Sequence, residues 1–70
     1  MQFNETETSA LLTQGAKIRS YGWQWLIPGI RVIFKGVEIG FISLGLFYQL
    51  INDGTITKKC STMKYNEYGA

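Results

Sequence analysis

The chain has 70 residues, one cysteine and no histidine, and its formal net charge is +2. So short a chain forms one small domain, and it lacks the cysteines for a disulfide framework and the histidines typical of zinc sites and acid–base catalysis. We therefore expect a single non-catalytic domain over residues 1–70 that needs neither metal nor cofactor.

The N-terminal segment, MQFNETETSA, is acidic and polar, which is unlike a secretory signal. The most apolar stretch, residues 36–51, is too short to span a bilayer and contains Glu38. The lone Cys60 fits a reducing compartment. We expect a cytoplasmic protein that does not enter the membrane.

The first predicted helix covers residues 5–14. Asn4 and Glu7 have the spacing of a capping box, in which each residue bonds the backbone of the other. Gly15 follows the apolar helix formers, and a glycine there can end a helix in the left-handed conformation.

A strand is predicted next, over residues 16–27, because AKIRSYGWQWLI is rich in aromatic and β-branched residues. Gly22 is a candidate bulge, and Pro28, which has no backbone N–H, ends the strand. Side chains alternate along a strand, so one face combines cations with aromatic rings: Lys17, Arg19, Tyr21, Trp23 and Trp25. The opposite face, which begins at Ile18, is too small and polar to form the main core surface alone.

The remaining segments predict a β-hairpin, a helix and a last strand. The hairpin has strands at 31–34 and 37–42 around a Lys35–Gly36 turn. Ser43 then caps a helix over 44–53, which carries an apolar stripe and ends at Gly54. Residues 55–60 form a strand with Cys60 half-buried, and residues 61–70 form another edge strand or a tail.

Together these elements predict an α+β domain with the order α-β-β-β-α-β, in which one apolar helix packs on an antiparallel sheet. The chain has no phosphate-binding loop, since GIRVIFKG lacks the required glycines and the following Ser or Thr. Glu38 and Asp53 are expected on the exposed surface, because charged residues rarely bury unpaired.

The aromatic strand has two explanations, and they can hold for different rings. In the first, Trp23 and Trp25 supply the core of a small sheet. In the second, aromatic rings stack on a planar ligand while cations meet its phosphates. The candidate ligand-binding residues are then Arg19, Tyr21, Trp23, Trp25, Arg31 and Lys35.

Two stretches, ALLTQGAKIRSYGW and RVIFKGVEIGFISLGLFYQLINDGTI, resemble a family of small phage proteins that sequester nucleotide signals, the second type of Thoeris anti-defence proteins. The residue-level matches are Gln14-Gly15, Gly22-Trp23, Phe41 and Ser43. Gln24-Trp25 stands where that family has an Asn. The resemblance implies a homo-oligomer in the host cytoplasm whose pockets, between subunits, hold a cyclic or otherwise phosphorylated nucleotide second messenger without converting it.

Two other kinds of partner are open. The stretch SLGLFYQLINDGTITKK also looks like the helix, glycine and basic strand of excisionase-type winged domains, with Lys58, Lys59 and Lys64 on phosphates, although its helix has no basic residue. Binding of single-stranded nucleic acid by the aromatic strand is the better variant of this reading. Alternatively, the aromatic strand or the KYNEYGA tail docks on a host enzyme and inhibits it.

Overall fold

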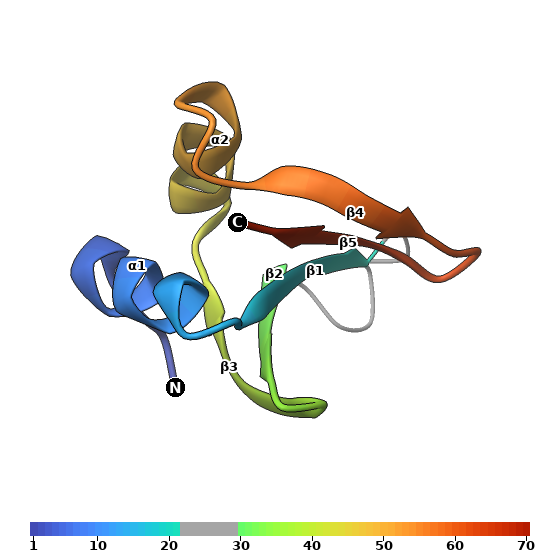
Figure 1. Cartoon of the computed structure of the whole chain (residues 1–70), viewed down its shortest axis with the longest axis horizontal. Helices are drawn as coiled ribbons and strands as arrows, with labels where there is room; N and C mark the ends of the chain where they lie inside the picture. Colours follow the sequence, from blue (N-terminus) through green and yellow to red (C-terminus); the bar gives the residue numbers. More distant parts are fainter. Residues whose placement is uncertain (22–29) are drawn as a thin grey trace.

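A computed structural model of the chain describes residues 1–21 and 30–70. The predictions for Gly22, Trp23, Trp25 and Pro28 lie outside these residues. The described elements, in chain order, are α1 (Glu5–Thr13), β1 (Lys17–Tyr21), β2 (Ile30–Phe34), β3 (Val37–Ile42), α2 (Leu44–Asn52), β4 (Thr57–Ser61) and β5 (Tyr65–Gly69) (Figure 1).

The five described strands form one sheet in the order β3-β2-β1-β5-β4, and every neighbouring pair is antiparallel. The predicted α+β class and the antiparallel sheet are therefore confirmed. The chain order is α-β-β-β-α-β-β, which has one strand more than the sequence predicted.

The local signals in the sequence are confirmed at both helices. At α1, Glu7 N donates to Asn4 Oδ1 over 2.8 Å and Asn4 N donates to Glu7 Oε1 over 3.1 Å, which completes the capping box. At α2, Ser43 Oγ accepts a hydrogen bond from Leu46 N over 3.1 Å. These caps satisfy backbone donors that a helix N-terminus leaves without partners inside the helix.

The β2–β3 hairpin also has its predicted turn. Lys35 and Gly36 both have positive φ, at 53° and 79°, which is the conformation of a two-residue type I′ turn. The register of this hairpin shifts between Val32 and Ile33, where β3 carries a bulge. The bulge alters which side chains of β3 face each side of the sheet.

The C-terminal segment differs from the prediction. β5 is neither a tail nor an edge strand, because it lies between β1 and β4 and pairs with both. The edge strand is β4, where all five residues are exposed, so the prediction of a half-buried Cys60 is wrong. At the opposite edge, Phe3 N donates to Phe41 O and Phe41 N donates to Met1 O, each over 2.9 Å, so the N-terminal segment pairs with β3.

The core lies between the two helices and one face of the sheet. Ile18 is fully buried there, and neighbouring strands supply the apolar area that β1 alone lacks. Both helices contribute to this core, where the sequence predicted one. Its buried residues are Leu12, Ala16, Ile18, Ile30, Val32, Ile42, Phe47, Leu50 and Ile56. Among the described residues, no helix has the length and apolarity needed to cross a membrane.

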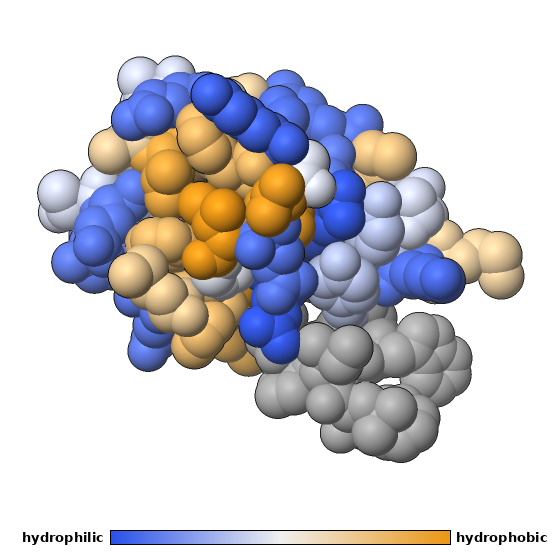
Figure 2. Space-filling view, turned by 90° about the horizontal axis from the view of Figure 1, so that it is seen from below, coloured by the Kyte–Doolittle hydropathy of each residue, from blue (hydrophilic) through white to orange (hydrophobic). Residues whose placement is uncertain are grey.

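Apolar side chains are also visible on the side of the molecule that carries the β2–β3 turn. Figure 2 shows this side from below the view of Figure 1, with apolar residues near its centre and polar ones around them. From this hairpin, Val37 is 60% exposed, whereas Phe34 and Ile39 are partly buried against the core.

Candidate functional site

The sheet has a second face, opposite the helices, which we call the outer face. Alternation along each strand identifies its residues, because Ile18, Val32, Ile42 and Tyr68 all pack on the helix side. The outer-face side chains of β1, β2, β3 and β5 are Lys17, Arg19, Tyr21, Arg31, Ile33, Glu38, Phe41, Tyr65 and Glu67, with Glu38 placed there by the bulge in β3.

The only two arginines of the chain lie side by side on this face. Arg19 of β1 and Arg31 of β2 are direct cross-strand partners. Phe41 lies opposite Arg31 on β3, and Glu67 lies opposite Arg19 on β5, so the four residues form a row across four strands. Like charges directly opposite each other destabilise a sheet, so this pairing has a cost in stability.

Arg19 is held firmly within this row. Its Nε donates to Glu67 Oε2 over 2.9 Å, and its Cζ lies 4.4 Å from the ring centroid of Tyr65. The Tyr65 ring in turn lies 5.3 Å from that of Tyr21. The hydrogen bond to Glu67 raises the pKa of Arg19 above its ordinary value, although partial burial opposes the shift. Arg19 is thus a fixed cation between an acid and two rings.

Arg31 has much weaker contacts. Its Nη1 lies 3.6 Å from Glu38 Oε2, which is longer than a hydrogen bond, and its Cζ lies 5.8 Å from the Phe41 centroid. Its Nε is buried and has no hydrogen-bond acceptor among the described residues. Arg31 therefore keeps donors that an incoming anion could fill.

Three of the six predicted binding residues, Arg19, Tyr21 and Arg31, thus lie on the outer face. Lys35 does not join them, because it occupies the hairpin turn at the opposite end of β1 and β2 from Tyr21, with its Nζ 5.3 Å from the Phe34 centroid. The other two, Trp23 and Trp25, lie outside the described residues.

Among the outer-face residues that were not predicted from the sequence are Tyr65 and Glu67. Both belong to β5, and they alternate with Asn66 and Tyr68 as a strand requires. That alternation was the available signal. Their position beside Arg19 depends on β5 pairing with β1, which spans 48 residues of sequence.

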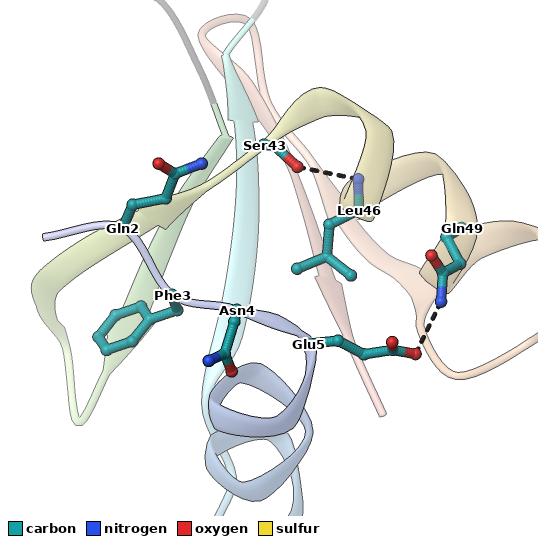
Figure 3. Close-up of a pocket in the computed structure, with 7 residues that line it drawn as sticks. All are labelled: Gln2, Phe3, Asn4, Glu5, Ser43, Leu46 and Gln49. Carbon is teal, nitrogen blue, oxygen red and sulfur yellow. Dashed lines mark hydrogen bonds between the residues drawn. The ribbon is translucent and has the colours of Figure 1, made fainter.

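A hollow of about 370 Å³ lies elsewhere, where the N-terminal segment meets the first turns of the two helices. Figure 3 shows its lining, which includes Phe3, Glu5, Leu46 and Gln49. Gln49 Nε2 donates to Glu5 Oε2 over 2.7 Å across it. None of the described residues that line this hollow is a lysine or an arginine. A phosphate would therefore find no cation there, and we place the candidate site on the outer face.

Within residues 1–21 and 30–70, no group of three His, Cys, Asp or Glu side chains is arranged to hold a metal ion. No family model matches the chain, and no curated protein or solved structure was found to match it.

Proposed function

We propose that this protein binds a phosphorylated or cyclic nucleotide signal on the outer face of its sheet and retains it unchanged, as a phage-type anti-defence protein. The observation that supports this most is the Arg19–Arg31 pair, which lies beside the rings of Tyr21, Tyr65 and Phe41. Guanidinium groups bind phosphate oxygens through two parallel hydrogen bonds, and aromatic rings stack on bases.

Retention without conversion needs no catalytic group. A tight and abundant binder lowers the free concentration of its ligand by mass action alone. The composition fits this mode of action, since the chain has no histidine to act as a general acid or base or to activate its one cysteine. The function is therefore sequestration of a signal, in line with the resemblance to anti-defence proteins.

The proposal includes a homo-oligomer. Binding sites for small molecules usually bury most of the ligand, whereas the face of one sheet contacts a ligand from one side only. A second copy packed against the outer face could close the site from the other side.

The proposal is tested by incubating the purified protein with a mixture of nucleoside phosphates and cyclic dinucleotides, washing it by gel filtration and denaturing it. Mass spectrometry should then find one nucleotide released in a fixed ratio to protein, with unchanged mass. Arg31→Met should lose this ligand, whereas Lys35→Met, which removes one cation from the hairpin turn, should keep it. A folded wild-type protein that releases nothing would contradict the proposal, and a ligand of altered mass would indicate an enzyme.

Single-stranded nucleic acid is a second candidate ligand. It is favoured by the outer-face rings together with Lys58 and Lys59, which are exposed on the neighbouring edge strand. The affinity for a nucleic-acid strand, which is bound through several backbone phosphates, falls steeply as salt concentration rises, whereas the affinity for a single enclosed nucleotide falls less. A fluorescent oligonucleotide titrated at several salt concentrations distinguishes the two ligands.

A further inference from the structure

We propose that Arg31 is the group of the outer face that takes the ligand's phosphate, and that Glu38 competes with the phosphate for it. This inference rests on the proposed function and assigns different roles to the two arginines. Arg19 is a positioning residue that Glu67 and Tyr65 hold in place. Arg31 is the binding residue, and an oxyanion displaces Glu38 from it.

The two arginines differ in the hydrogen bonds that their side-chain N–H donors make. Arg19 Nε already donates to a carboxylate at 2.9 Å, so a ligand would have to break a good charge-assisted hydrogen bond to use it. Within residues 1–21 and 30–70, Arg31 Nε is buried without an acceptor, and its Nη1 lies 3.6 Å from Glu38 Oε2. A buried donor without a partner is costly, so movement of this guanidinium toward a phosphate would relieve an unfavourable state.

The bulge in β3 is what brings Glu38 to this face. Phe41 points outward and Gly40 lies on the helix side, so uninterrupted alternation would turn Glu38 toward the helices. The extra residue, Ile39, packs against the core instead, and Glu38 becomes the direct partner of the outward-facing Ile33. Bulges commonly re-aim a side chain in this way. The result is a carboxylate next to Arg31 but too far away to bond it well.

Glu38 is a weak competitor by its geometry. Its side chain is 49% exposed, whereas that of Arg31 is 19% exposed. Exposed ion pairs contribute little, and a phosphate carries more charge and more acceptor oxygens than a carboxylate. Neutralising Glu38 should therefore tighten binding of an oxyanion by about two- to fivefold.

The test titrates the protein with pyrophosphate or with ADP and monitors binding by NMR. The two arginines give two side-chain Nε–H signals in a ¹⁵N-labelled protein. Both probes should shift the Arg31 signal more than that of Arg19. Glu38→Gln should tighten binding two- to fivefold, and Arg31→Lys should weaken it because lysine lacks the planar fork. Glu5→Gln is the control, since it removes the same charge near the hollow on the helix side.

A double-mutant cycle separates direct competition from a general effect of charge. If Glu38 acts through Arg31, Glu38→Gln should have no effect on the residual binding of pyrophosphate in an Arg31→Met protein. An undiminished effect in that background would overturn the inference. So would shifts at Arg19 alone, even if ADP bound tightly and the proposed function stood. Conversely, pyrophosphate at Arg31 without any nucleotide binding would support the inference and contradict the proposed function.

Discussion

Replacing Arg19 should destabilise the fold, whereas replacing its neighbour Arg31 should not. Arg19→Met removes a hydrogen bond of 2.9 Å to Glu67 and the contact with the Tyr65 ring. A hydrogen bond to a charged group contributes about 1.5–3 kcal/mol, and partial exposure of this pair reduces the expected loss to about 1–2 kcal/mol.

Arg31→Met removes little that is favourable. The contact with Glu38 is long and half-exposed, so it contributes less than about 1 kcal/mol. The substitution also removes a buried donor that has no acceptor in the described part of the chain, and such a donor costs about 1–3 kcal/mol. We expect this variant to be as stable as the wild type or more stable by about 1 kcal/mol.

Both substitutions remove the same repulsion between adjacent arginines, so their difference reports on the other contacts. The assay is urea unfolding followed by far-UV circular dichroism, supported by the midpoint of thermal unfolding, which should move by about 4–8 °C per kcal/mol in a domain of this size. Equal losses of stability in the two variants would refute the claim that Arg19 has stabilising contacts and Arg31 has only weak ones.

Three further changes test local interactions. In Gly40→Ala, the new Cβ would lie 2.5 Å from Met1 O and from the Phe3 ring, so the N-terminal segment should move away from β3. The Phe41 amide, which donates to Met1 O, should then exchange its hydrogen faster, and an unchanged exchange rate would contradict this. Asn4→Ala should cost about 1 kcal/mol in urea unfolding by removing the capping box, and a loss near zero would argue against that role. Hydrogen bonds from Thr55 lower the pKa of the Asp53 carboxyl below its ordinary 3.8. They therefore stabilise the fold above about pH 4, and this stabilisation is lost as pH falls through the lowered pKa. The free energy of unfolding of Asp53→Ala should depend less on pH in acid, and an unchanged dependence would contradict this.

The predictions from sequence succeeded where the interaction is local. The bond between Asn4 and Glu7, the cap at Ser43 and the turn at Lys35–Gly36 each involve residues no more than three positions apart. Such interactions depend on backbone geometry that a few residues determine by themselves. The alternation along β1 likewise predicted that Arg19 and Tyr21 share a face.

The predictions failed where pairing between distant segments decides the outcome. Nothing near residues 61–70 shows that β5 inserts between β1 and β4, so Glu67 was not predicted as the partner of Arg19. The bulge that turns Glu38 outward is equally a product of strand pairing. The sequence therefore predicted that cations and aromatic rings share one face of β1, whereas the contacts of each arginine emerged only from the assembled sheet.

The most direct test of ligand binding on the outer face is an amide chemical-shift map with ADP, using adenosine as the phosphate-free control. ADP should shift the amide signals of Arg19, Arg31 and Tyr65, and adenosine should shift them much less. Shifts centred on Leu46 and Gln49 would instead place the site at the hollow between the helices and contradict binding on the outer face.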